Sequence, residues 1–267
     1  MLNAITLQLT TDIWLLSLQP MENYQHDAVV PFKESSESKK KQVEKMFDKI
    51  AFRYDFLNHF LSAGIDVGWR KKAILQLKEL DPKSILDVAT GTGDMAILSY
   101  KMLNAEKIIG IDISDGMLEV GKKKIEKLGF QQHIELLNGD SETITFSNNS
   151  FDAVTVAFGV RNFQNLELGL QEINRVLKPG GKLIVLEFTK PKFPVIKDFY
   201  NLYLNVITPW VGRLVSKNKD AYKYLNESVQ KFPEGNEFVQ ILKKLGYKNA
   251  SCKTLSLGIS SIYCGEK

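Results

Sequence analysis

The stretch Asp87-Val88-Ala89-Thr90-Gly91-Thr92-Gly93-Asp94 decides the fold of this chain. It closes an apolar run that starts at Ser84 and predicts a buried strand, and it precedes a run from Met95 to Leu103 that predicts a helix. Glycines at a strand-to-helix turn let the backbone approach a ligand closely and point free N–H groups at it. We therefore expect a ligand site at this turn, formed by Gly91, Thr92 and Gly93.

An acidic residue follows at the end of the next predicted strand. Asp112 ends the apolar run 108–111, about 20 residues beyond the glycines. A carboxylate in this position can accept hydrogen bonds from both hydroxyls of a ribose. Together with the glycine turn, Asp112 predicts a site for a nucleoside-containing cofactor at the carboxyl ends of parallel strands.

Two classes of cofactor fit this pattern. Gly91, Gly93 and Ala96 match the spacing of the dinucleotide fingerprint, which is weak evidence on its own. Asp87 favours S-adenosylmethionine, because a carboxylate at the strand end can pair with an α-ammonium group, which a dinucleotide lacks. A nicotinamide-dependent dehydrogenase remains the alternative.

Two further segments favour S-adenosylmethionine. Asp140 and Ser141 follow a third apolar run, at the place where methyltransferases commonly contact the adenine. The turn Lys178-Pro179-Gly180-Gly181 precedes the run 182–188 and is typical of the start of the fifth strand in that fold. We therefore predict S-adenosyl-L-methionine as the cofactor.

The order of the predicted elements gives the fold class. Strands are expected at 84–89, 107–112, 133–137, 152–158, 182–188, 248–256 and 259–264, the last two as a hairpin around Gly258. Helices are expected at 94–103, 115–128, 165–177 and 237–245. This alternation predicts an α/β protein of the class I S-adenosylmethionine-dependent methyltransferase type, Rossmann-like, with a mostly parallel seven-stranded sheet and an N-terminal helical cap.

Residues 1–40 are expected to be a disordered lead, within which 1–20 is an extension of the gene model before a true start at Met21. Residues 41–267 are expected to form a single methyltransferase domain, with a helical cap at 41–80 and a substrate lid at 190–235. The lid contains an aromatic segment, 193–210, that either covers an apolar substrate or is a buried helix completing the domain.

Composition excludes several classes of protein. The 267 residues are 44% hydrophobic and carry a net charge of +4 without a basic stripe, so nucleic-acid binding is not expected. The basic cluster Lys39-Lys40-Lys41 is expected to be a solvated face, with weak attraction to an anionic membrane as the alternative. Cys252 and Cys264 form neither a metal pattern nor a disulfide framework, so we expect no metal and a reducing, cytoplasmic location.

Segments outside the cofactor motifs narrow the family. The run from Tyr54 to Ser62, with Trp69 downstream, resembles the N-terminal signature of the ubiquinone/menaquinone biosynthesis C-methyltransferases of the UbiE type. Phe158-Gly159-Val160-Arg161-Asn162 resembles their FGxRN segment, and 175–189 resembles their second signature. The likeness extends from about Val43 to the C-terminus.

The resemblance implies methyl transfer to a ring carbon of a quinol that carries a polyprenyl chain. Demethylmenaquinol is the expected acceptor, with the benzoquinol precursor of ubiquinone or another lipid-like acceptor as alternatives. A scaffold subunit that has lost activity is the non-enzyme alternative. Transient contact with the inner face of the membrane and a homodimer are further expectations.

The methyl group of the cofactor is already activated, but the quinol carbon that attacks it must be made more nucleophilic. A base, acting directly or through water, removes a quinol proton and raises the electron density of the ring. Arg161 and Asn162 follow the fourth predicted strand and are the first candidates to hold the quinol oxygen; the alternative for Arg161 is an ion pair that braces the loop. From the cap, Tyr54, Asp55 and His59 are the further catalytic candidates.

Overall fold

The computed structural model describes residues 24–62, 64–191 and 219–267, without the side chains of 56–61 and 219–222. The suggested start at Met21 and the aromatic segment 193–210 therefore lie outside the described residues.

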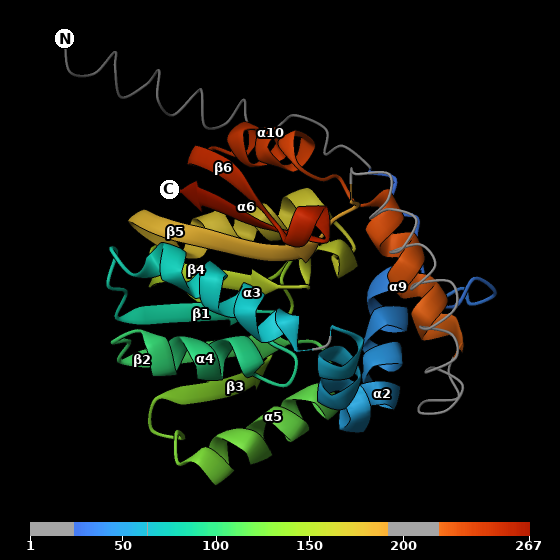
Figure 1. Cartoon of the computed structure of the whole chain (residues 1–267), viewed down its shortest axis with the longest axis horizontal. Coiled ribbons are helices and arrows are strands. Elements are labelled where there is room, and N and C mark those ends of the chain that lie inside the picture. The colour runs from blue at the N-terminus through green and yellow to red at the C-terminus, as the bar shows by residue number, and fades with distance from the viewer. Residues whose placement is uncertain (1–23, 63, 192–218) are drawn as a thin grey trace.

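A seven-stranded sheet forms the centre of the molecule (Figure 1). Its order is β3-β2-β1-β4-β5-β7-β6, and among the described strands β7 alone runs antiparallel to its neighbours. This confirms the predicted class I fold and the C-terminal hairpin. The strands are β1 (Ser84–Val88), β2 (Lys107–Asp112), β3 (Ile134–Asn138), β4 (Phe151–Ala157), β5 (Leu177–Phe188), β6 (Lys248–Leu255) and β7 (Ser260–Glu266).

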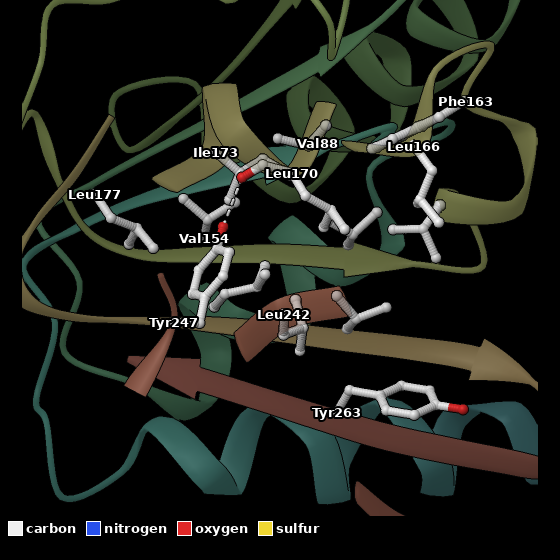
Figure 2. Close-up of a cluster of buried hydrophobic side chains, with 14 of the residues drawn as sticks. Val88, Val154, Phe163, Leu166, Leu170, Ile173, Leu177, Leu242, Tyr247 and Tyr263 are labelled. Carbon is white, nitrogen blue, oxygen red and sulfur yellow. Dashed lines mark hydrogen bonds between the residues drawn. The ribbon is translucent and has the colours of Figure 1, made fainter. Parts of the chain in front are cut away.

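Helices cover both faces of this sheet. One face packs against α3 (Ile65–Ile74), α4 (Asp94–Met102) and α5 (Asp115–Leu128). The other packs against α6 (Leu166–Val176) and α10 (Asn236–Lys244), whose apolar side chains meet those of β1 and β4 (Figure 2). Because parallel strands covered on both faces bury nearly every side chain, they appear in the sequence as the continuous apolar runs noted above.

The chain reverses its order across the sheet next to β1. It proceeds outward through β2 and β3, and then returns to place β4 on the other side of β1. In open α/β sheets, ligands bind outside the carboxyl ends of the strands at such a reversal. The glycine turn that follows β1 lies at this point.

Two helices at the N-terminal side complete the cap. α2 (Lys39–Leu61) ends before Gly64, which adopts a left-handed φ of 76° and precedes α3. For the second cap helix the sequence predicts the range 69–80. α3 begins four residues earlier, and it ends at Ile74, where a short 3-10 turn, Leu75–Leu77, follows. α5 matches the expected bounds, and the other predicted elements of the sheet and its helices differ by a few residues at most, apart from the earlier start of β5.

One local prediction was wrong. Within the expected lid, the one-residue spacing of Tyr222 and Tyr224 predicts an extended segment or turn, but both residues lie in the helix α9 (Lys219–Lys231). The buried residues Tyr224, Ser228 and Phe232 recur at helical spacing, and that longer pattern shows the correct period.

The described part of the N-terminal lead is packed rather than mobile. His26 is fully buried, and the Tyr24 hydroxyl donates to Glu167 Oε1 on α6 at 2.7 Å. Val29 contacts a small apolar cluster with Val43 and Tyr224. Residues 24–38 therefore join the cap and α9, because their few apolar side chains pack against buried side chains of α2 and α9.

Candidate functional site

The glycine turn after β1 has the backbone that a close ligand contact requires. Gly91 and Gly93 have φ values of 57° and 78°, in the left-handed region that glycine adopts without strain. Gly93 directly precedes α4, so the turn leads into a helix N-terminus. Thr92 faces the other way, and its hydroxyl donates to Asp55 Oδ1 on α2 at 2.5 Å. Gly91 lines a cavity, whereas Thr92 fastens the turn to the cap.

Asp112 lies at the end of β2 beside that turn, as predicted. Its carboxylate accepts from the Gly91 N–H at 2.8 Å and from the Ser114 N–H at 2.9 Å. Burial raises the pKa of Asp112 to about 6, against the opposing effect of these backbone donors. The side chain also lines the cavity, and each carboxylate oxygen has a further lone pair that can accept from a ligand there.

Asp87 lies deeper than Asp112. Its two carboxylate oxygens accept from the hydroxyls of Thr90 at 2.5 Å and Thr155 at 2.6 Å. The side chain is 1% exposed, and burial raises its pKa to about 6. Asp87 has no ion pair among the described residues, and an unpaired buried carboxylate costs folding free energy. It is therefore a candidate to face a cationic group of a ligand.

The third strand contributes Asp140 and Ser141, and both line the cavity. Asp140 Oδ2 accepts from Lys40 Nζ at 2.5 Å, and Asp140 Oδ1 accepts from the Glu142 N–H at 2.9 Å. Lys40 also pairs with Glu142 at 3.0 Å. The expected solvated face of the lysine cluster is therefore wrong for Lys40, which reaches from α2 across the rim of the cavity.

Two residues beside the cavity have unusual backbone conformations. Ala89 after β1 has a φ of 53° and Phe158 after β4 has a φ of 60°, and neither is glycine. Such strained residues persist where the surrounding structure holds them and they concentrate at functional sites. A Cβ on Gly159 would lie 2.7 Å from the Ala89 Cβ, so glycine is needed for the two strand ends to approach.

The segment after β4 separates the two polar candidates. Asn162 lines the cavity, with Nδ2 donating to the Phe158 carbonyl at 3.4 Å and Oδ1 accepting from the Tyr224 hydroxyl at 3.0 Å. Arg161 does not line it. The Arg161 guanidinium donates to Glu187 Oε1 and to the Phe158 carbonyl, both at 2.6 Å, and lies over the Phe188 ring.

The helix α2 closes the cavity from the side of the cap. Val43, Phe47 and Tyr54 line it from one face of the helix. Three polar contacts fix α2 to the ends of the first three strands. They join Lys40 to Asp140, Asp48 to the Ser114 hydroxyl at 2.6 Å, and Asp55 to Thr92.

Of the other two cap candidates, Asp55 is engaged in contacts outside the cavity. Besides Thr92, its carboxylate pairs with Lys124 Nζ at 2.8 Å. His59 lies in α2, in the stretch whose side chains the structure leaves undescribed, so its role stays a prediction.

One cavity, with about 630 Å³ of space including its open mouth, brings together six of the predicted site residues: Tyr54, Gly91, Asp112, Asp140, Ser141 and Asn162. Asp55, Asp87, Thr92, Gly93 and Arg161 lie outside its lining. A nucleoside cofactor fits the residues present, because an acid beside a glycine turn, a polar pair at the third strand and an apolar wall from α2 face the same space. The lining residues that sequence reasoning missed are Lys40, Val43, Phe47, Ala89, Ile113, Met117, Gly139, Glu142, Ala157 and Phe163, together with Gln164.

Comparisons with known proteins found matches in a single protein family. The model of the ubiE/COQ5 methyltransferase family matches residues 35–267. A demethylmenaquinone methyltransferase of Bacteroides fragilis is 44% identical over 247 residues, which is 92% of this chain and all of that protein. A ubiquinone/menaquinone biosynthesis C-methyltransferase UbiE of Geotalea daltonii is 43% identical, over 86% of this chain and 97% of that protein.

Solved structures show the same fold at low identity. A SAM-dependent methyltransferase of Thermotoga maritima has a TM-score of 0.59 at 17% identity, covering 84% of this chain and 99% of that one. A SAM-dependent methyltransferase of Aquifex aeolicus has a TM-score of 0.53 at 20% identity, covering 73% and 88%. At this identity they support the fold alone.

Proposed function

The chain belongs to the ubiE/COQ5 methyltransferase family, and from this premise we propose that it methylates a ring carbon of demethylmenaquinol. The enzyme is a C-methyltransferase that uses S-adenosyl-L-methionine. The observation that carries the proposal is that one cavity holds both Asp112, beside the glycine turn, and Asn162, from the segment after β4. The relatives that bear the name demethylmenaquinone methyltransferase support this choice of acceptor.

The residues around the first three strands hold the cofactor in this proposal. S-adenosylmethionine supplies a methyl group already activated by its sulfonium charge. Asp112 accepts from the ribose hydroxyls, and Asp87 provides negative charge for the α-ammonium group. Asp140 and Ser141 contact the adenine, while Thr92 holds the turn that carries Gly91 and Gly93. Alignment of the reacting atoms can lower the barrier by about 7–11 kcal/mol.

Asn162 touches the acceptor in this proposal, since its amide lines the cavity. It binds a quinol hydroxyl, and Tyr54 forms the opposite wall. Arg161 acts without lining the cavity. Its ion pair with Glu187 fixes the segment after β4, and its positive charge stabilises the negative charge that develops on the quinol oxygen. The quinol hydroxyl loses a proton as the ring carbon attacks the methyl group, and the ring carbon then loses the proton that the methyl group replaces. A base must accept these protons, and His59 remains the candidate from the sequence.

The benzoquinol precursor of ubiquinone is a second candidate acceptor. The Geotalea daltonii relative carries both quinones in its name at nearly the same identity. The two acceptors present the same quinol edge to Asn162 and differ in the width of the ring system. Competition between short-chain forms of the two substrates in one assay gives their relative kcat/KM, and a preference for the benzoquinol would overturn the menaquinol assignment.

We also propose that the protein works at a membrane surface. A polyprenyl chain needs apolar cover, and Phe52 on α2 and Leu257 at the β6–β7 turn are 92% and 61% exposed. No helix among the described residues is long and apolar enough to cross a bilayer. Co-sedimentation with anionic vesicles, compared between the wild type and Phe52→Ser, tests the contact; equal binding by both would remove Phe52 from it. Formation of a homodimer stays a prediction.

Arg161→Lys tests the division of roles between Arg161 and the cofactor residues. Lysine keeps the charge but lacks the planar guanidinium, whose Nη1 donates to both Glu187 and the Phe158 carbonyl, so we expect the segment and the quinol oxygen to be misplaced. We expect turnover to fall about a hundredfold, as for loss of one oxyanion donor. Cofactor affinity should stay within about threefold, under 1 kcal/mol.

The measurement is single-turnover transfer of a labelled methyl group to a short-chain demethylmenaquinol, alongside a thermal melt. If folding and cofactor affinity collapse together, Arg161 serves structure alone. If turnover is unchanged, Tyr54 and His59 become the leading catalytic candidates. Transfer of no label by the wild-type enzyme to either quinol would refute the proposed function itself.

A further inference from the structure

The segment Phe158–Asn162, here called the acceptor loop, is held by side chains from three other elements. Glu187 on β5 binds Arg161, Tyr224 on α9 binds Asn162, and Lys39 at the start of α2 binds the Arg161 carbonyl. The acceptor loop is therefore the place where β5, α9 and the cap meet. Of the three partners, Tyr224 and Lys39 come from outside the sheet.

Tyr224 fixes the amide of Asn162. Its side chain is 3% exposed, and its hydroxyl donates to Asn162 Oδ1 at 3.0 Å. Asn162 Nδ2 donates to the Phe158 carbonyl at 3.4 Å, so the two contacts define which end of the amide is which. An amide has two N–H donors and two acceptor lone pairs, and one of each remains for a ligand in the cavity.

Lys39 fixes the backbone on the other side of Asn162. Its ammonium donates to the carbonyls of Arg161 at 3.3 Å and His26 at 2.8 Å, with the residue 5% exposed. Burial lowers the pKa of Lys39 to about 8. The prediction of a solvated face is therefore wrong for Lys39 as well. A buried cation held by backbone carbonyls contributes more to the positioning of those carbonyls than to the net free energy of folding.

We propose that Tyr224 and Lys39 are positioning residues for the methyl acceptor, which act through the Asn162 amide and the Arg161 carbonyl. The inference rests on the proposed function, because Asn162 is taken to bind the quinol hydroxyl. It also gives α9 and the N-terminal residues 24–39 a role in the reaction. These elements hold the acceptor loop in the geometry that the transfer needs, since a small misplacement of a polar contact lowers the rate strongly.

Tyr224→Phe tests the inference, with Tyr247→Phe as the matched control. Tyr247 is equally buried at 3% exposure, and its hydroxyl donates to the Leu170 carbonyl at 2.8 Å in the core (Figure 2). Tyr247 does not line the cavity. Each variant loses one buried hydrogen bond and should lose similar stability. We expect Tyr224→Phe to lower kcat with short-chain demethylmenaquinol about fivefold to tenfold. Tyr247→Phe should stay within about twofold of wild type, and cofactor affinity should be unchanged in both.

A double-mutant cycle separates positioning from general stability. If Tyr224 acts through Asn162, Tyr224→Phe should have no further effect on kcat in an Asn162→Ala background. Lys39→Met should lower kcat as well, while Lys41→Met, which removes an exposed lysine paired with Glu44, should not. Equal kcat in Tyr224→Phe and Tyr247→Phe, or additive losses in the cycle, would overturn the inference. A wild-type enzyme inactive on quinols would instead refute the proposed function.

Discussion

Asp112→Ala is expected to weaken cofactor binding without unfolding the protein. The carboxylate lines the cavity and in this proposal accepts from two ribose hydroxyls. Hydrogen bonds to a charged group contribute about 1.5–3 kcal/mol each. Loss of one such bond raises Kd about tenfold, and loss of two raises it about a hundredfold or more.

The variant also removes the acceptor of the Gly91 and Ser114 N–H groups, so part of any effect comes from a loosened loop. Asp48→Ala controls for this. Asp48 accepts from the Ser114 hydroxyl at 2.6 Å and the Gly116 N–H at 3.0 Å, in the same segment, and does not line the cavity. Titration calorimetry with S-adenosylmethionine should show a Kd increase at least tenfold larger in Asp112→Ala than in Asp48→Ala.

The pH dependence provides an independent check. Burial raises the pKa of Asp112 to about 6 in the free protein. The ionised carboxylate is the stronger acceptor, so the affinity of the wild type should fall as pH drops below about 6. This fall should be smaller in Asp112→Ala, which keeps the Asp87 carboxylate but has lost that of Asp112. Equal Kd values for Asp112→Ala and Asp48→Ala, or an unchanged pH profile, would refute the assignment of Asp112 to the ribose.

Two further substitutions probe the same strand ends. The pKa of Asp87 is about 6 in the folded state against an ordinary value of 3.8, so the folded state binds the proton more tightly and the ionised carboxylate costs stability above that range. Asp87→Asn should therefore raise the free energy of unfolding by about 1–3 kcal/mol at pH 7.5, and this gain should vanish towards pH 4. Denaturant titrations at both pH values check this. The same variant should still lower cofactor affinity. Gly159→Ala should destabilise by about 1–3 kcal/mol, because the new Cβ would lie 2.7 Å from the Ala89 Cβ. Gly68→Ala has open space and should not, and melts that rank the two variants equally would contradict this account.

The sequence by itself determined the parallel sheet and the cofactor side of the site. The buried strands are visible as continuous apolar runs, and Gly91, Gly93 and Asp112 follow such runs within a short stretch of sequence. A buried strand that leads into a glycine turn is compatible with few other folds. Because parallel strands end at one edge, the placement of Asp112 and Asp140 near the turn followed from topology.

Tertiary structure decided what the polar side chains do. Lys39 and Lys40 are neighbours in an exposed-looking cluster, yet one is buried against the Arg161 carbonyl and the other pairs with Asp140. Partners 100 or more residues away set these contacts, so no local pattern reveals them. Arg161 and Asn162 are adjacent as well, and the backbone turns one towards Glu187 and the other into the cavity. Burial and charge pairing depend on which segments meet in the folded protein. For this reason the sequence predicted where the site lies, whereas only the tertiary structure showed which contacts its side chains make.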